Sequence, residues 1–324
     1  MTTRHIVLLT YGEPPAPDYL PQLEYSWRIL LGLTRTVAPI PKAVLPMIAL
    51  ARAYSRRKLW RAERYGSPLE LVTRAQAAGL SSALTAVAPA VAWRVHVAYE
   101  FRDPLLTDLL DSLPADEPVD VVPMYVADSS FTHGISRMTI RDWERKRGAR
   151  PAPVRIVPAM DEKEFADISA AFVARQLDER GIGGPDWALV LAAHGTLLDP
   201  RPGIETGRGA TECVCAGVTE QLSERFGMVV NGWLNHKFGG RWTEPPVDDA
   251  LARVAAAGFR RVVYFPYGFS SDNAESQLEG RLALRSQPGL EAVHLPCLNA
   301  DPVFIARLSH QVAGEVATEP VLAI

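Results

Sequence analysis

The chain has 324 residues, of which 48% are hydrophobic and 22% charged, a composition that fits an ordinary soluble globular protein. With about 100 to 200 residues per domain, this length predicts two domains or one large domain with two similar halves. The 34 Lys and Arg residues against 37 Asp and Glu give a formal charge of −3, so no basic excess favours nucleic acid and we expect no nucleic-acid partner.

Strands and helices are predicted to alternate along the chain. Short apolar runs that are rich in Val and Ile and bounded by polar, Gly or Pro residues are typical of parallel strands buried on both faces. In chain order these runs are 6–10, 93–98, 119–123, 154–157, 187–192, 228–233 and 261–266. Helices are predicted at 72–87, 161–179, 211–225, 246–257, 273–283 and 302–317. The alternation predicts an α/β fold of parallel sheets with helices on both faces.

The two halves of the chain resemble each other. Residues 6–12 (IVLLTYG) and 189–195 (LVLAAHG) are each a buried strand that ends in an aromatic side chain and Gly, and the runs 121–130 and 262–271 both end in a pair of serines. We therefore predict two similar doubly wound halves, 1–180 and 181–324, with the join near 181–185. Ligands of such sheets bind outside the carboxyl ends of the strands. Tyr11, residues 128–132, His194 and residues 270–275 are thus expected around one cleft.

The side chains at these strand ends can handle a metal ion or a proton. His194 ends an apolar run and is followed by Gly, which lets the chain turn and leaves an imidazole that titrates near neutral pH or binds a metal. Glu275 lies near the start of a predicted helix, and Glu279 lies one turn further on the same face. The two acids form a track toward His194, while Tyr11 adds an oxygen ligand or an aromatic platform from the other half.

Each of these residues also has a purely structural interpretation. His194 fits a partly buried, hydrogen-bonded histidine, and an acid at position 275 fits helix capping. Tyr11 fits an aromatic side chain at an interface. The other loop histidines, His133 and His236, are expected to be solvated.

Cysteine usage and hydropathy indicate the compartment. Cys213, Cys215 and Cys297 are an odd number in a long chain, which argues against a disulfide framework. Cys213 and Cys215 are expected on a helix, because no second Cys or His pair has a metal-site spacing. No signal peptide and no apolar run near the roughly 20 residues of a membrane span is present. We expect a cytoplasmic protein in which the apolar segment 30–50, interrupted by prolines, is a candidate for peripheral membrane contact.

Motifs for other chemistries are absent from the sequence. No G-x-G-x-x-G follows a strand, and neither a phosphate-binding G-x-x-x-x-G-K-[ST] loop nor a G-x-S-x-G nucleophile elbow occurs. Nucleotide chemistry and acyl transfer therefore lack their usual signatures.

Five segments, in the right order, resemble the signatures of the ferrochelatase family across nearly the whole chain. Residues 6–14 resemble its opening strand and Y-G-x-P turn, residues 65–76 its G-x-S-P-L and T-x-x-Q signature, and residues 191–195 its S-A-H-G strand end. Residues 268–275 resemble G-F-x-x-D-H-x-E, with Asn273 in place of His, and residues 296–304 resemble the closing L-N-x-x-P-x-F. Further departures are Ala283, where a carboxylate often stands, and the loop 196–211, which lacks D-P-Y-x-x-Q.

The resemblance implies a chelatase-like fold and an enzyme, a ferrochelatase, that inserts ferrous iron into a porphyrin in haem biosynthesis. It assigns the catalytic and metal-handling roles to His194 and Glu275. Tyr11 matches the position that faces the metal from the other side of the macrocycle, and Tyr there resembles the branch that acts on coproporphyrin III, with protoporphyrin IX as the other substrate. Arg28 and Ser67 match positions that bind the porphyrin propionates, and the planar guanidinium of Arg suits a carboxylate.

Ferrous iron is a substrate in this reaction, so the resemblance implies no permanent cofactor and no iron–sulfur cluster. The expected partners are the porphyrin, ferrous iron and, as candidates, other enzymes of the haem pathway. Two alternatives stay open. One is a chelatase for another metal or tetrapyrrole, because His194 and Glu275 do not themselves select the metal. The other is a non-catalytic porphyrin or haem carrier with the same fold.

Overall fold

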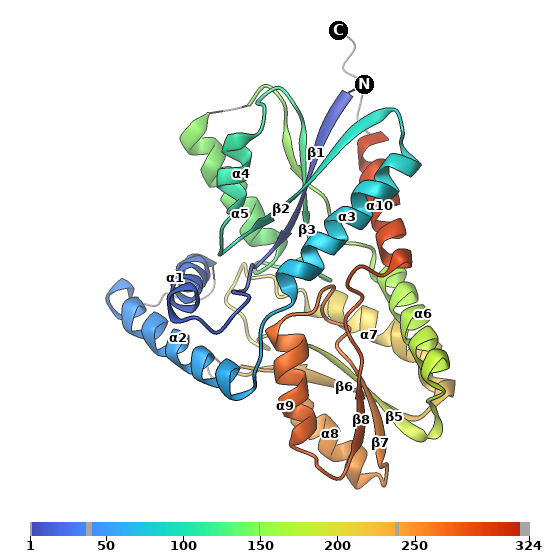
Figure 1. Cartoon of the computed structure of the whole chain (residues 1–324). Helices are drawn as coiled ribbons and strands as arrows, with labels where there is room; N and C mark the ends of the chain where they lie inside the picture. Colours follow the sequence, from blue (N-terminus) through green and yellow to red (C-terminus); the bar gives the residue numbers. More distant parts are fainter. Residues whose placement is uncertain (1, 37–40, 149, 237–239, 318–324) are drawn as a thin grey trace.

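Two parallel sheets organise the chain in a computed structural model that describes residues 2–36, 41–148, 150–236 and 240–317 (Figure 1). The first sheet has four strands in the order β2 (Val91–Tyr99), β1 (Thr2–Thr10), β3 (Val119–Pro123) and β4 (Val154–Ile156). The second sheet has the order β6 (Phe226–Leu234), β5 (Gly184–His194), β7 (Arg261–Phe265) and β8 (Glu291–His294). In both sheets the first strand lies between the second and the third, so the two halves repeat one topology.

Helices connect these strands. The α-helices are α1 (Tyr19–Thr36), α2 (Leu45–Ala62), α3 (Leu69–Val87), α4 (Leu106–Ser112), α5 (His133–Arg147), α6 (Glu162–Arg180), α7 (Arg208–Leu222), α8 (Val247–Ala256), α9 (Gly280–Arg285) and α10 (Pro302–Ala317). Short 3₁₀ turns occur at Lys42–Val44 and Ser223–Arg225, and a π-helix spans Ala274–Glu279. The predicted α/β fold is confirmed, and each predicted strand is present. The prediction missed β8, α1, α2, α4 and α5, and it was wrong in assigning one α-helix to 273–283.

The central strand of each sheet is buried on both faces. In β1, Ile6 and Leu8 face a core that includes α3 and α6, whereas Val7 and Leu9 face a second core formed with α4 and α5. The same alternation holds in β5, where the odd-numbered residues 189–193 face the first of these cores and the even-numbered residues 188–192 pack with α8. Burial on both faces explains why these strands appear in the sequence as continuous apolar runs.

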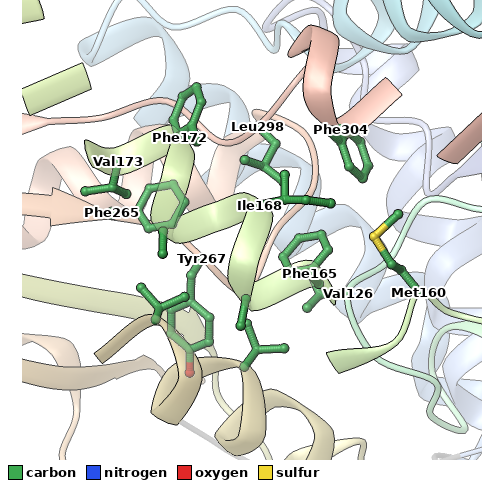
Figure 2. Packing of buried hydrophobic residues seen from close by; sticks show 14 of the residues in the cluster. Val126, Met160, Phe165, Ile168, Phe172, Val173, Phe265, Tyr267, Leu298 and Phe304 are labelled. Carbon is green, nitrogen blue, oxygen red and sulfur yellow. The ribbon is translucent and has the colours of Figure 1, made fainter. Parts of the chain in front are cut away.

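One hydrophobic core joins the two sheets. Figure 2 shows side chains of α6 in this core beside residues of β7 and α10. The ring centroid of Phe165 lies 6.1 Å from that of Phe304 on α10, and the centroid of Phe172 lies 5.9 Å from that of Phe265 on β7. The last helix, α10, also packs against α3 of the first half. The division of the chain at 180 and 181 stays a prediction.

Among the helices of the described ranges, none combines the length and the apolar character of a membrane-spanning segment. Of the segment 30–50, which we expected to be a candidate for membrane contact, residues 37–40 lie outside the described part of the chain. The remainder covers the end of α1, a 3₁₀ turn and the start of α2.

Candidate active site

His194 is the last residue of β5, and its imidazole meets a carboxylate from a distant segment. The Nδ1 atom lies 2.5 Å from Oε1 of Glu275, and 44% of the His194 side chain stays exposed. The next residue, Gly195, lies close to the residue that follows β6. A Cβ atom at position 195 would lie 1.9 Å from Oδ1 of Asn235, so only glycine fits there without a shift. The structure thus brings His194 and Glu275 together, with the imidazole open to solvent.

The π-helix Ala274–Glu279 carries Glu275, and its start is capped by a side chain. Oδ1 of Asn273 accepts hydrogen bonds from the backbone N–H groups of Glu275 (2.8 Å) and Ser276 (3.0 Å). In return, the Ser276 hydroxyl accepts from the Asn273 N–H at 3.0 Å, which completes a capping box. The ring of His294 bonds the Ser276 carbonyl at 3.0 Å. These contacts fix the backbone beneath Glu275.

The loop before the π-helix is held by residues from three of the sequence signatures. Nε2 of Gln76 donates to the Ser271 hydroxyl and to the Asn299 carbonyl, both at 2.9 Å. The Asn299 side chain in turn bonds Asp272 twice, accepting from its N–H and donating to its carboxylate, each at 2.8 Å. The signature residues outside the His–Glu pair therefore act as a scaffold that places Glu275.

Opposing effects set the protonation of this pair. Desolvation lowers the pKa of His194, but the charge and hydrogen bond of Glu275, with a smaller contribution from Glu279, outweigh it and raise the pKa above its usual value. Burial and then the charge of Glu275 raise the pKa of Glu279 to about 7. His194 is thus a strengthened base, and Glu279 can exist in either protonation state near neutral pH.

Tyr11 follows β1, at the carboxyl end of the first sheet. Its hydroxyl donates to the Phe131 carbonyl at 2.5 Å, and its ring centroid lies 5.1 Å from that of Tyr125. Burial, with smaller contributions from nearby charges that include Glu275, raises the pKa of Tyr11 well above its usual value. Tyr11 therefore stays a neutral hydroxyl within the electrostatic reach of Glu275.

Glu13 lies beside Tyr11 in a tight turn that begins at Gly12, whose φ of +80° favours glycine. Its carboxylate is 7% exposed and accepts from the Ser67 hydroxyl and from the Ala274 N–H, both at 2.8 Å. Arg56 lies 3.5 Å from the other oxygen. The single hydroxyl proton of Ser67 is therefore used by Glu13, and the role of Ser67 in propionate binding stays a prediction.

Arg28 lies on α1 and is already paired with protein carboxylates. It bonds Glu24 at 2.5 Å and Asp103 at 2.9 Å, and 24% of its side chain is exposed. These partners hold the guanidinium in place, and its role in propionate binding also stays a prediction.

Two arginines on α2 reach the site and were missed in the sequence. Arg52 carries a pKa lowered by burial and by Arg56, while the charge of Glu279 opposes this shift. Arg56 lies 4.9 Å from the ring centroid of Trp60. Their separation by four residues places both on one face of α2, a signal that the sequence contains.

The prediction of a solvated loop histidine is confirmed for His236, which is exposed and lies in the loop after β6. It was wrong for His133, which lies in α5 and is buried. The His236 ring centroid lies 5.2 Å from that of His194 and 5.2 Å from that of Trp242. Desolvation by the neighbouring rings and then the charge of His194 lower the pKa of His236. His236 lies two residues after β6, the neighbour of β5, so its place near a strand end was the signal that could have found it.

His133 is the first residue of α5 and is fully buried, which lowers its pKa to about 4. Just before it, residues 128–130 line a cavity of about 550 Å³ together with residues 205–210. Asp128 pairs there with Arg137, whose nitrogens lie 2.7 and 2.8 Å from its oxygens.

Metal-binding side chains occur at the site as a pair. Across the described ranges, no three His, Cys, Asp or Glu side chains converge to hold a metal ion. Cys213 and Cys215 lie on α7, as predicted. Ferrous iron accepts imidazole and carboxylate ligands. His194 and Glu275 can therefore bind such an ion transiently, before other ligands replace them.

Comparisons with known proteins identify the family. A family model described as Ferrochelatase matches residues 4–316. A ferrochelatase of Synechococcus sp. (strain JA-3-3Ab) is 27% identical over 321 residues, covering 95% of this chain and 92% of the relative. A ferrochelatase of Xylella fastidiosa (strain 9a5c) is 26% identical over 324 residues, covering 94% of this chain and 95% of the relative.

Solved structures share the fold at lower identity. CbiX, described as the terminal enzyme for biosynthesis of siroheme in denitrifying bacteria, has a TM-score of 0.53 and 15% identity, and the match covers 96% of this chain and 98% of that one. SirB from Bacillus subtilis with Fe3+ has a TM-score of 0.54 and 10% identity, with 98% of each chain covered. Because the family model spans nearly the whole chain, this chain belongs to the ferrochelatase family of lyases, which insert a metal into a porphyrin.

Proposed function

We propose that this chain inserts ferrous iron into a porphyrin during haem biosynthesis, with coproporphyrin III as the favoured substrate and protoporphyrin IX as the other. The observation that carries the proposal is the contact of 2.5 Å between His194 and Glu275 at the end of β5. Tyr11, at the end of β1, supports the coproporphyrin assignment through its match to that branch of the family.

The reaction needs a base, because two inner N–H protons must leave the macrocycle before the metal binds its nitrogens. Nδ1 of His194 is bonded to Glu275, so Nε2 is the atom that accepts each proton. Glu275 stabilises the imidazolium that forms. The imidazolium then gives this proton to Glu279, whose pKa of about 7 lets the carboxylate take it up and release it to solvent, and neutral His194 is regenerated as the base.

Two arginines and a serine from the first half support binding of the porphyrin carboxylates. We assign Arg28 and Ser67 to this role from the family resemblance, and Arg52 because it lies near Glu279 as a largely buried cation. A guanidinium meets a carboxylate with two hydrogen bonds. Since coproporphyrin III carries more carboxylates than protoporphyrin IX, these cations favour it.

Two other functions remain as alternatives. A chelatase for another metal or tetrapyrrole would use the same His194 and Glu275. The fold shared with CbiX and SirB favours this alternative over a carrier. A porphyrin or haem carrier would keep the fold without the reaction.

The test is an anaerobic absorbance assay of ferrous iron with coproporphyrin III and protoporphyrin IX side by side, repeated with cobalt. We expect metallation of both porphyrins by ferrous iron and a higher kcat/KM for coproporphyrin III. Faster turnover with cobalt would favour the other chelatase, and porphyrin binding without any metallation would favour the carrier.

We also propose peripheral contact with a membrane through α2, whose first six residues, 45–50, are the end of the segment 30–50 that was expected to make it. Its sequence, LPMIALARAYSRRKLWRA, contains basic residues and no acid. Met47 is 69% exposed, Leu50 45% and Tyr54 59%. Exposed apolar side chains on a basic helix favour an anionic lipid surface. The cytoplasmic location and contacts with other enzymes of the haem pathway stay predictions from the sequence.

A further inference from the structure

Glu13 connects the turn after β1 to the start of the π-helix, although 261 positions separate it from Ala274. Its Oε2 atom accepts from the Ala274 N–H and from the Ser67 hydroxyl, both at 2.8 Å. The other oxygen lies 3.5 Å from Arg56 of α2. One carboxylate therefore contacts the π-helix, the segment before α3 and α2.

A carboxylate in this place must have partners, because it is 7% exposed and a buried charge without hydrogen bonds is unfavourable. The two donors at 2.8 Å and the nearby guanidinium supply them. The turn at Gly12 directs the side chain inward, and Arg102 fixes the backbone by donating to the Glu13 carbonyl at 3.0 Å. Glu13 is held at both its backbone and its carboxylate.

The Ala274 N–H is one of the helix-terminal donors that lack a partner within the helix itself. Asn273 accepts from the next two N–H groups, those of Glu275 and Ser276, and Glu13 accepts from the one before them. Glu13 thus completes the cap at the residue that immediately precedes Glu275.

We infer that Glu13 is a positioning residue, which fixes the start of the π-helix against the turn after β1 so that Glu275 stays in contact with His194. The structural part of this inference depends only on the contacts of Glu13. Its kinetic consequence rests on the proposed function.

The test compares Glu13→Ala, which removes the acceptor oxygens, with Glu13→Gln, which keeps one of them. Hydrogen exchange followed by mass spectrometry measures the amides of 274–279 without any turnover. We expect clearly faster exchange there in Glu13→Ala and a smaller change in Glu13→Gln. Asp120→Asn, which alters a buried carboxylate paired with Arg4 at 3.0 Å in the first sheet, is the control and should leave this segment unchanged.

Kinetics separate positioning from substrate binding. We expect Glu13→Ala to lower kcat for metallation about tenfold or more, with the Kd for porphyrin, from fluorescence quenching, within about threefold of the unaltered chain. Glu13→Gln should lose less kcat, and formate or acetate should partly restore Glu13→Ala by occupying the vacated place, whereas chloride should not.

Unchanged exchange at 274–279 together with unchanged kcat in a folded Glu13→Ala would overturn the inference, and so would a higher Kd with unchanged kcat. If Glu13→Ala does not fold, Ser67→Ala and Glu13→Gln decide. The inference then requires faster exchange in Glu13→Gln than in Ser67→Ala, because Ser67→Ala leaves the bond to Ala274 intact. If the unaltered chain metallates no porphyrin, the proposed function fails, while the exchange comparison still tests Glu13.

Discussion

Local desolvation and a neighbouring carboxylate act on the pKa of His194 in opposite directions. Desolvation alone would make its imidazole a weaker base, whereas the charge of Glu275 at 2.5 Å makes it a stronger one, and the second effect prevails. A stronger base suits a step in which protons leave a pyrrole nitrogen. Removal of the Glu275 carboxylate should therefore change the pH range in which the His194 imidazole acts as a base.

For Glu275→Gln we expect the pKa of His194 to fall, because the charge that raises it is gone while the local desolvation that lowers it remains. Since the neutral imidazole is the base, activity rises with pH through this pKa, and the rise should move to lower pH in the variant. A profile of kcat/KM for metallation between about pH 5 and pH 9 measures the shift. Glu291→Gln, at the exposed amino end of β8, is the control, and an unmoved profile in Glu275→Gln would count against the pair.

Glu100 offers a prediction about stability rather than activity. Burial raises its pKa from 4.5 to about 7, despite hydrogen bonds from Ser136 and Thr139. The folded chain thus binds the proton more tightly than the unfolded chain, so stability falls as pH rises from about 4.5 to about 7.

Glu100→Gln removes this titration. We expect its free energy of unfolding to exceed that of the unaltered chain by about 1 to 3 kcal/mol above pH 7 and to match it near pH 4.5. Urea unfolding at both pH values provides the measurement. Equal differences at the two pH values would show that Glu100 does not carry the effect.

The site was predicted from the positions of residues at strand ends more than from the residue types themselves. His194, Tyr11 and the loop before Glu275 each follow an apolar run, and parallel strands bring such positions to one edge. Burial of His133 and the approach of the His236 ring to that of His194 both depend on packing between distant segments, so the sequence indicated only that the two residues lie in loops. The bond from Ser67 to Glu13 joins positions 54 apart and has no local signature.

At the scale of the element, the π-helix is the clearest departure from prediction. The apolar and acidic spacing over 273–283 predicts one α-helix, but the chain forms a π-helix over Ala274–Glu279 and then α9. The cap at Asn273 and the bond from His294 to the Ser276 carbonyl both stabilise this segment, and the second of these depends on β8. A π-helix is rare and often marks a functional site.

Asn273→Ala should destabilise this element by about 1 kcal/mol, because two backbone N–H groups lose their acceptor. It should also lower kcat, since Glu275 is the residue whose N–H is released. Asn273→Asp keeps the acceptor and serves as the matched control. Thermal unfolding and metallation kinetics on both variants check the prediction. It fails if Asn273→Ala and Asn273→Asp have the same stability and the same kcat.

The strand and helices that were not predicted from the sequence have weak hydrophobic patterns. In β8 only four residues pair, and its first two are exposed. Apolar residues of α2 are spread around the helix, with Leu45 and Ala49 buried and Met47 and Leu50 exposed, so periodicity does not stand out. Strands buried on both faces gave a clear signal because most of their residues are apolar.

For the whole molecule, one helix links the site to a surface. The face of α2 that carries Arg52 and Arg56 reaches the site, while Met47, Leu50 and Tyr54 are exposed to solvent. Such an arrangement would bring a membrane surface close to the place where a poorly soluble porphyrin must enter.

We expect the chain to cosediment with vesicles that contain phosphatidylglycerol, and less with phosphatidylcholine alone or at high salt, because exposed charges are screened. The double variant Met47→Ser and Leu50→Ser should reduce binding to the anionic vesicles. Leu71→Ser, on α3 at a position 74% exposed, is the control. Binding that is equal for both lipids and insensitive to salt would contradict a role for the basic residues of α2.

Whether His194 removes the porphyrin protons is decided by the metallation rate of His194→Ala measured beside its porphyrin affinity. General base catalysis contributes about 10² to 10⁴ in rate, so ferrous iron insertion should fall by about 10² or more, with the Kd for coproporphyrin III within about threefold of the unaltered chain. A His194→Ala chain that inserts iron at the normal rate would contradict the account.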